Sequence, residues 1–270
     1  MRAWIEREVT VTGEIEQRHL RPWSTAMWVP TADGPVWFKA AREAFAYEAR
    51  ILQVLAPLAP DILPEVVAAR PEAGWLLVRD AGRRAREHPI EWAPLLRRYA
   101  ELQIASIPHA QALLAAGIVD NREPAVERLF QYLSAAIAER LRARMPEVEE
   151  RLARLAASPL PATVEHNDLH DGNVFLCGGR ARILDWGDAA LAHPLFTLTV
   201  EEDTAARGAY LEPWAELYPR ERLLADVEDV LALRYLLRAV TWDRLIGLDA
   251  TAAARIEERV VLFLGASSER

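Results

Sequence analysis

One short stretch of the chain combines carboxylate, amide and imidazole side chains at a spacing that could bind a metal ion and move a proton. It runs from residue 166 to residue 174 and contains Asp168 and, five residues later, Asn173. Asp185 follows twelve residues after Asn173. Between these two lie a short apolar run, a Gly178-Gly179 pair and a second apolar run, which together predict a β-hairpin. Because a hairpin returns the chain on itself, we expect Asp185 to lie near Asn173.

These side chains have the donor atoms of a magnesium site. Carboxylate and amide oxygens are the ligands that Mg²⁺ prefers, and the ion often shares them with phosphate groups. Asn173 and Asp185 are therefore the candidate metal ligands. Asp168 remains to orient or deprotonate an attacking hydroxyl group, which makes it the candidate catalytic residue.

Two other interpretations of the stretch remain open. Asn, Asp and Gly are frequent in surface turns, so the segment could be a loop without chemistry. It could also belong to a metallohydrolase, with zinc or iron held by His166, Asp168, His170 and Asp171. The hydrolase interpretation gives no reason for the amide and the carboxylate that follow at this spacing.

The pattern H-x-D-x-x-x-x-N, followed by an apolar run and an aspartate, resembles the catalytic loop and metal-binding aspartate of protein-kinase-like phosphotransferases. The version here, HNDLHDGNV with Leu-Asp-Trp in place of Asp-Phe-Gly, is similar to the aminoglycoside phosphotransferase and choline kinase branch. The resemblance implies ATP or GTP as donor, Mg²⁺, and a small-molecule hydroxyl as acceptor. It also implies an α+β, protein-kinase-like fold, with a small antiparallel-sheet lobe carrying one key helix and a larger, mainly helical lobe.

Composition limits the remaining possibilities. The chain has 270 residues, of which 51% are apolar, enough for a substantial core. Its net charge of −8 argues against general binding of nucleic acid, which needs basic surface. The one cysteine, Cys177, cannot form an internal disulfide, and we expect it to pack within the predicted hairpin.

The sequence carries no sign of a membrane or export signal. Residues 1–21 lack the apolar core of a signal peptide. No run approaches the roughly 18 apolar residues of a membrane helix. We therefore expect a cytoplasmic protein, a monomer or a homodimer, that does not act at a membrane.

The first forty residues predict a small sheet. Strand-like runs at 9–11, 15–20, 25–29 and 36–39 are separated by turns, with a hairpin signal at Thr31–Gly34. The resemblance implies that the loop between the first two strands covers the nucleotide phosphates. This loop, residues 21–25, has no G-x-G-x-x-G, so Ser24 and Thr25 are the candidate phosphate contacts, and an ordinary polar turn is the alternative.

Lys39 stands out because it is the only lysine, the other 31 basic residues being arginine. A guanidinium fork and an ammonium point charge are not interchangeable. In the family a lysine on the third strand contacts the α- and β-phosphates, and Lys39 occupies that place. The apolar spacing that follows predicts a helix over 40–55, on which Glu48 is the expected partner of Lys39 and Glu43 a second candidate.

Two further strands, at 65–69 and 75–78, lead into a short polar segment. The resemblance makes this segment the hinge, where backbone atoms of Val78 and Asp80 would bind adenine. We accordingly place a lobe boundary after residue 80, with a nucleotide-binding lobe at 1–80 and a catalytic and acceptor-binding lobe at 81–270.

The second lobe is expected to be helical. Helical spacing covers 89–107, 123–145 and 147–155, a short strand at 163–165 precedes the catalytic stretch, and only helices are expected from residue 189 onward, broken by Pro194, Pro213 and Pro219.

After Gly187 the chain has fifteen acidic residues and nine arginines. In the family this region lines the acceptor pocket, so we expect a cationic acceptor, with Glu201–Asp203 as a candidate clamp. The competing interpretation is that the acidic residues keep the helices soluble. A catalytically silent, nucleotide-binding regulatory protein is the alternative to a kinase.

Overall fold

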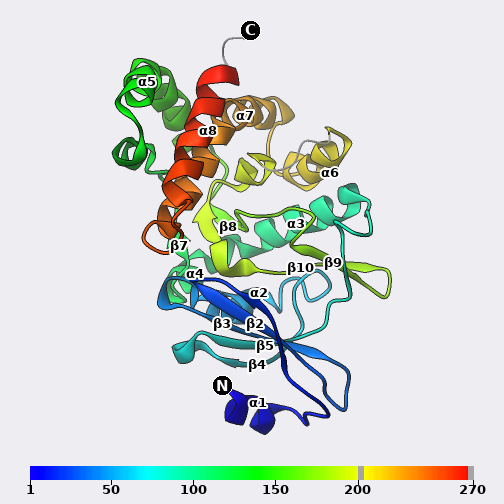
Figure 1. Cartoon of the computed structure of the whole chain (residues 1–270). Coiled ribbons are helices and arrows are strands. Elements are labelled where there is room, and N and C mark those ends of the chain that lie inside the picture. Colours follow the sequence, from blue (N-terminus) through cyan, green and yellow to red (C-terminus); the bar gives the residue numbers. More distant parts are fainter. Residues whose placement is uncertain (200–203, 267–270) are drawn as a thin grey trace. The chain divides into compact units, whose positions relative to one another are not determined.

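The computed structural model describes residues 1–199 and 204–266 (Figure 1). Packing divides the chain into two compact units, here called the sheet unit and the helical unit. The sheet unit comprises Met1–Glu91, Gln111–Ile118 and Leu169–Ala189. The helical unit comprises Trp92–Ala110, Val119–Asp168 and the described residues from Ala190 onward. The candidate clamp Glu201–Asp203 lies outside the described residues.

The division differs from a single boundary after residue 80, because two later segments pack with the sheet. Ile183 N–H donates to the carbonyl of Ile62 at 2.7 Å. Strand β6 (Arg83–Arg84) pairs with β9 (Val174–Cys177). The second half of the catalytic stretch, from Leu169, therefore belongs to the same unit as Lys39.

The main sheet of this unit has five antiparallel strands in the order β1-β2-β3-β5-β4. Their bounds are β1 Glu16–Leu20, β2 Ser24–Val29, β3 Val36–Ala41, β4 Val66–Arg70 and β5 Trp75–Arg79. The expected strands and the hairpin turn at Thr31–Gly34 are confirmed, except that Val11 forms only an isolated bridge with Thr31.

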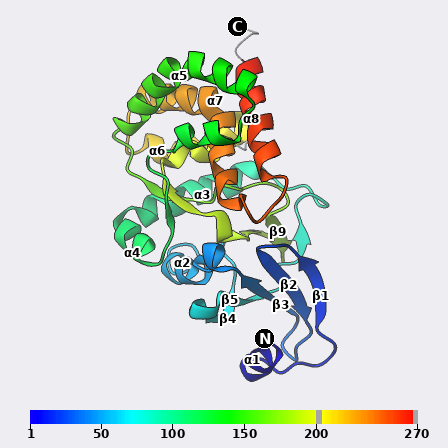
Figure 2. The ribbon, with the colours of Figure 1, turned by 60° about the vertical axis from the view of Figure 1, so that its left-hand side comes forward.

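A helix that the sequence analysis did not predict, α1 (Arg2–Glu8), covers part of this sheet. Its Trp4 and Ile5 are buried against sheet residues, and Trp4 lies 5.9 Å from Phe38 and 5.6 Å from Trp75, centroid to centroid. The helix is visible at the N-terminus in Figure 2.

The helix expected over 40–55 begins later than predicted. Strand β3 continues to Ala41, whose N–H donates to the carbonyl of Gly74 at 2.9 Å. A 3₁₀ turn at Glu43–Phe45 follows, and helix α2 spans Glu48–Leu55. Pairing with the neighbouring strand thus outweighs the helical propensity of the alanines.

The predicted hairpin after Asn173 is confirmed. Strands β9 and β10 (Arg180–Ile183) are antiparallel, with Val174 opposite Ile183. The turn glycines, Gly178 and Gly179, have φ of 57° and 79°, which favours glycine. Cys177 is exposed at the end of β9, so the expectation that it packs inside the hairpin is wrong.

The helical unit contains most of the long helices. Figure 2 shows α5, α7 and α8 side by side, and residues of each pair are in contact. The helices of this unit are α3 Trp92–Ser106, α5 Ala135–Ala156, α6 Thr204–Ala215, α7 Arg220–Trp242 and α8 Ala252–Ala266. The short α4, Ala110–Ala115, belongs to the sheet unit except for its first residue.

Three predictions for this unit need correction. Strand β11 (Ala190–Ala192) pairs with β8 (Thr163–Glu165) and β7 (Val119–Asp120), where only helices were expected. The helix expected over 123–145 is a 3₁₀ segment, Val126–Tyr132, followed by α5, which continues through Pro146. Pro213 lies inside α6 and does not end it. The α+β fold, with a sheet-rich N-terminal part and a helical C-terminal part, is as predicted.

The contact between the hinge segment and β9 depends on a glycine. Gly82 has a φ of +84°, and a Cβ there would lie 2.1 Å from the carbonyl oxygen of Leu176. At Gly178, φ is +57°, but a Cβ would meet no described atom within 4 Å.

We therefore expect Gly82→Ala to destabilise the protein by at least about 3 kcal/mol, because left-handed strain and a backbone clash add. Gly178→Ala should cost about 1 kcal/mol, from the strain alone. Urea unfolding of the two variants measures the difference. Equal costs would show that residue 82 can move away from β9.

Candidate functional site

Lys39 is the centre of a charged cluster in the sheet unit. Its side chain is 21% exposed and lies 2.6 Å from the Oε2 of Glu48, at the first turn of α2. The same ammonium contacts the carboxylate of Asp185. The expected contact between Lys39 and Glu48 is thus present, whereas Glu43 is exposed in the 3₁₀ turn.

The electrostatics of this cluster keep Lys39 charged. Burial alone would lower the pKa of Lys39, but the carboxylates of Asp185 and Glu48 outweigh it and hold the pKa above its ordinary value. Burial raises the pKa of Glu48, and its contact with Lys39 opposes this. The ammonium of Lys39 therefore forms ion pairs with two carboxylates.

A backbone bond fixes the carboxylate of Glu48. The second oxygen of Glu48 accepts the N–H of Trp186 at 3.0 Å. Trp186 is fully buried and donates its ring N–H to the carbonyl of Ile183 at 2.8 Å. Asp185, the residue before Trp186, has a φ of +64°, a conformation uncommon for a residue with a side chain. The turn after β10 is thus tied to α2 through the residue that follows Asp185.

The hairpin brings Asn173 to the same place. The N–H of Leu184 donates to the carbonyl of Asn173 at 2.8 Å, and the N–H of Asn173 donates to the carbonyl of His170 at 2.9 Å. Asn173 and Asp185 therefore stand at the two ends of one hairpin, and Asp185 contacts the ammonium of Lys39. An amide and a carboxylate that leave the other positions to water and phosphate are a donor set that fits Mg²⁺.

Among the described residues, no three His, Cys, Asp or Glu side chains are placed to hold a metal ion together. The zinc or iron set considered from the sequence is thus not assembled in the part of the chain that the structure describes.

The expected phosphate contacts Ser24 and Thr25 are the first two residues of β2. The hydroxyl of Thr25 donates to the carbonyl of His19 at 3.1 Å and accepts from Gln17 at 2.9 Å. The N–H of Ser24 donates to Arg21 O at 3.3 Å. Both residues are therefore engaged in the β1–β2 hairpin.

Basic side chains near Asp185 were missed by the sequence analysis. The pKa of His19 is lowered by burial and by the charges of Arg84 and Arg21, while Asp185 raises it. The guanidinium of Arg84 also lies over the ring of Phe175, 5.5 Å from its centroid. In a chain with 31 arginines, residue type alone does not distinguish Arg21 and Arg84 from the others.

The expected hinge residues lie at the end of β5. Val78 is within the strand, opposite Trp37. The N–H of Asp80 donates to the carbonyl of Pro35 at 3.1 Å, and its carboxylate accepts the N–H of Gly82 at 2.6 Å. An adenine contact through the Asp80 N–H would have to replace the bond to Pro35.

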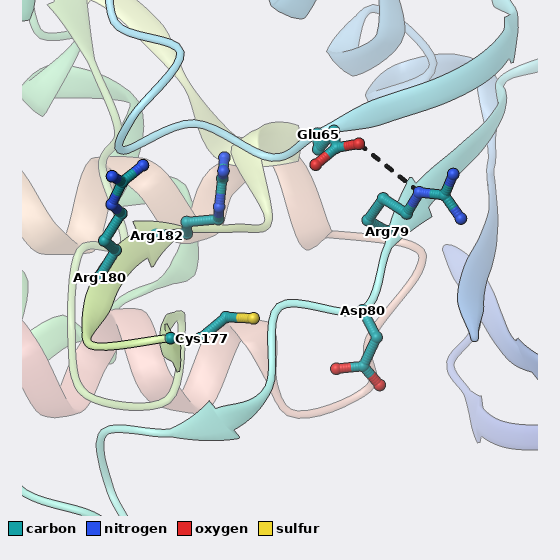
Figure 3. Close-up of a pocket in the computed structure, with 7 residues that line it drawn as sticks. Glu65, Arg79, Asp80, Cys177, Arg180 and Arg182 are labelled. Carbon is teal, nitrogen blue, oxygen red and sulfur yellow. Dashed lines mark ion pairs between the residues drawn. The ribbon is translucent and has the colours of Figure 1, made fainter. Parts of the chain in front are cut away.

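Beside Asp80 the sheet unit has a surface pocket of about 340 Å³ (Figure 3). It contains an ion pair between Arg79 and Glu65 at 3.5 Å. The pocket is lined by Glu65, Arg79, Asp80, Cys177, Gly178, Arg180 and Arg182. Of the predicted site residues only Asp80 is among them, so this pocket is distinct from the cluster around Lys39.

Asp168, the candidate base, belongs to the helical unit and lies two residues after a fully buried histidine, His166, which follows β8. The N–H of Asp168 donates to the Nδ1 of His166 at 3.3 Å, and the N–H of His166 donates to the hydroxyl of Tyr99 at 2.8 Å. His166 thus supports the loop. The carboxylate of Asp168 accepts a bond from Arg238 of α7 at 3.0 Å, a contact that the sequence analysis missed.

Glu165, which was also missed, is 1% exposed. It accepts the N–H of Asn167 at 3.1 Å, the side-chain amide of Gln103 at 3.1 Å and the hydroxyl of Thr197. Burial raises the pKa of Glu165 to about 7, although these donors and the charge of Arg238 oppose the shift.

His170 and Asp171, in the sheet unit, are bound by another residue that was not predicted. Arg86 donates to the carboxylate of Asp171 at 2.7 Å and lies 3.5 Å from the Nδ1 of His170. That Nδ1 also accepts the N–H of Gly172 at 2.9 Å. These contacts shape the loop that leads to Asn173.

Comparison with protein families now decides the class of this site. Residues 36–224 match the model of the APH family, described as a phosphotransferase enzyme family. The chain belongs to this family. The match includes Lys39, Glu48, Asp168, Asn173 and Asp185, and it confirms the expected small-molecule kinase.

Solved structures of low sequence identity share the fold. An aminoglycoside 2'-phosphotransferase-IIIa in its GDP complex has 14% identity and a TM-score of 0.68, over 99% of this chain and 97% of that chain. A choline/ethanolamine kinase family protein from Mesorhizobium loti has 18% identity and a TM-score of 0.61, over 96% and 90%. A macrolide 2'-phosphotransferase type I has 16% identity and a TM-score of 0.61, over 95% and 93%. Among curated proteins, no sequence matches significantly.

None of the described helices has the length and apolar character needed to cross a membrane.

Replacing Glu165 by glutamine is expected to change how stability depends on pH. Folding raises the pKa of Glu165 to about 7. A carboxyl whose pKa is raised on folding stabilises the fold below its unfolded pKa, and this stabilisation is lost as pH rises through the folded pKa. Between about pH 4 and pH 8, the free energy of unfolding of the wild type should therefore fall by up to about 3 kcal/mol more than that of the variant. Urea unfolding across this range measures it, and parallel curves for the two proteins would contradict it.

Proposed function

We propose that the protein transfers the γ-phosphate of ATP or GTP to a hydroxyl group of a small molecule, with Mg²⁺ as the metal. The observation that carries the proposal is the placement of Lys39 between the carboxylates of Glu48 and Asp185. Such a cluster is what a triphosphate site requires, because catalysis of phosphoryl transfer depends on positioning and on neutralising charge.

Lys39 provides the charge for the phosphates. Glu48, 5% exposed and bonded to Trp186, holds the ammonium in place. Asn173 and Asp185 would hold Mg²⁺, which when bound neutralises charge on the phosphate oxygens. Arg21 and Arg84, the basic neighbours of His19 near Asp185, are further candidates for phosphate contacts.

Asp168 acts on the acceptor. Its carboxylate accepts the proton of the acceptor hydroxyl while that oxygen forms a bond to the γ-phosphorus. The bond from phosphorus to the β–γ bridging oxygen breaks, and the nucleoside diphosphate leaves with its electron pair. His166 contributes by accepting the N–H of Asp168, which supports the loop that carries the base.

The identity of the nucleotide and the location of the protein remain predictions. Two aminoglycoside phosphotransferases with the same fold were solved with GDP, so both ATP and GTP belong in any assay. We retain the prediction of a cytoplasmic monomer or homodimer. Backbone contacts of Val78 and Asp80 with the base, and of Ser24 and Thr25 with the phosphates, are likewise proposals.

The proposal is tested by separating binding from transfer. Asp168→Asn should lower transfer by about 10²–10⁴-fold and leave nucleotide affinity almost unchanged, because its carboxylate acts on the acceptor. Asp185→Ala should instead abolish magnesium-dependent nucleotide binding. Calorimetry with ATP and GTP, with and without magnesium, and a coupled ADP- or GDP-release assay over hydroxylated acceptors measure the two effects.

Wild-type turnover by Asp168→Asn would exclude Asp168 as the base. Unchanged affinity of Asp185→Ala in both metal conditions would remove the metal assignment. Nucleotide binding without transfer to any acceptor by the wild type would favour the silent regulatory protein.

A cationic acceptor is the finer part of the proposal. It is supported by the excess of acidic residues after Gly187. Several of these carboxylates are engaged in the helical scaffold, since Asp229 lies 2.7 Å from both Arg151 and Arg154, and Asp226 lies 2.9 Å from Arg222. A cationic group would therefore rely on the remaining carboxylates of this segment.

A matched pair of acceptors tests this part. An amino sugar should be phosphorylated with a kcat/KM about tenfold above that of its neutral hydroxyl analogue at low salt, and the ratio should shrink at high salt as charges are screened. Equal efficiency, or a preference for the neutral compound, would discard the cationic acceptor while leaving the kinase proposal intact.

A further inference from the structure

The backbone of Asn167, the residue before the candidate base, is bonded through both its N–H and its carbonyl. The N–H of Asn167 donates to Glu165 at 3.1 Å, and its carbonyl accepts a bond from the Nη1 of Arg238. Both bonds are made within the helical unit, where β8 supplies Glu165 and α7 supplies Arg238. We call this arrangement the Asn167 clamp.

The clamp holds an uncommon backbone conformation. Asn167 has a φ of +63° and is one of two non-glycine residues with positive φ in the described part of the chain. Such residues persist where surrounding contacts determine their conformation, and they occur often at functional sites. The carbonyl of Asn167 and the Cα of Asp168 belong to the same planar peptide unit, so the Asn167 clamp also determines the position of that Cα.

Arg238 makes a second contact that bears directly on the carboxylate. Its Nη2 donates to the Oδ1 of Asp168 at 3.0 Å, while its Nη1 donates to the Asn167 carbonyl. One planar guanidinium thus bonds the backbone and the side chain of two consecutive residues. A lysine has one nitrogen and lacks the fixed fork, so it could not reproduce both bonds in the same geometry.

The supports of the clamp are themselves rigid. Glu165 and its partners Gln103 and Thr197 are at most 1% exposed. The side chain of Arg238 is 15% exposed, so water competes little for its bonds. One side of the Asn167 clamp is therefore held by the buried hydrogen bonds of Glu165 with Gln103 and Thr197, and the other side by α7.

We propose that Arg238 is a positioning residue that sets the orientation of the Asp168 carboxylate toward the acceptor hydroxyl. This rests on the proposed function, in which Asp168 is the base. The guanidinium does not accept or give a proton; it fixes the carboxylate so that Oδ2 meets the hydroxyl while Oδ1 is bonded to Arg238. Misplacement of a reacting group by about 1 Å can cost about 10²-fold in rate.

The test compares Arg238→Gln and Arg238→Lys with a control, Arg220→Gln, which makes the same charge change at the exposed start of the same helix. We expect Arg238→Gln to lower kcat by about 10- to 100-fold, with the KM of the nucleotide within about twofold of wild type. Arg238→Lys, which keeps the charge and can keep one bond, should fall between, and Arg220→Gln should match the wild type. Thermal unfolding of each variant confirms that it is folded.

Hydrogen exchange gives a readout that does not need turnover. In Arg238→Gln, the amides of Asn167 and Asp168 should exchange at least about tenfold faster than in the wild type, because the clamp has lost one side. Arg220→Gln should leave their exchange unchanged. This measurement stands even if no acceptor is found.

Three outcomes would overturn the inference. These are a kcat of folded Arg238→Gln within about twofold of wild type, an effect confined to the KM of the acceptor, and unchanged amide exchange. An effect on acceptor KM alone would make Arg238 a substrate contact. Failure of the proposed function looks different, since the wild type itself would then neither bind magnesium nucleotide nor transfer phosphate.

Discussion

The ion pair of Lys39 with Glu48, and its extension to Asp185, joins two neighbouring segments of the chain to a third that follows more than a hundred residues later. Strand β3 carries the ammonium, α2 carries the buried carboxylate and the turn after β10 carries the exposed one. A charge taken out of water is tolerated only when partners compensate it, and loss of one partner leaves the other unpaired. The hydroxyl of Tyr47, next to Glu48, adds bonds to the carbonyls of Gly187 at 2.6 Å and Ala189 at 3.0 Å. Charge compensation at Lys39 and the packing of α2 against this turn therefore depend on each other.

The parts of the site that the sequence predicts are those with a local signal. The hairpin between Asn173 and Asp185 is encoded by two short apolar runs and a glycine pair, so its return could be derived without tertiary information. Lys39 could be identified because it is the only lysine and lies in an apolar strand. Glu48 could be chosen over Glu43 by the resemblance, and its burial on α2 agrees with that choice.

The parts that the sequence does not predict depend on contacts between distant segments. Ala190–Ala192 has a composition that favours a helix, and it becomes a strand because β7 and β8 lie on either side of it. Arg238 follows helical spacing like many other arginines, and nothing local indicates that it reaches Asp168. Glu165 precedes the catalytic stretch but is recognisable only once its burial and its three donors are known.

The catalytic stretch passes from one compact unit to the other within a few residues. Residues up to Asp168 pack in the helical unit, where β8, Tyr99 and Arg238 hold them, whereas Leu169 onward packs in the sheet unit with Lys39. In the proposed reaction, the base and the groups that neutralise the phosphates are thus positioned by different sets of contacts, each within its own unit. A substitution in α7 that changes the contact of Arg238 with Asp168 acts on the first set, whereas Lys39, Glu48 and Asp185 contact one another in the second. The chemistry proposed for this chain is therefore argued from the groups that each unit places, because function is determined by the groups placed on a fold more than by the fold itself.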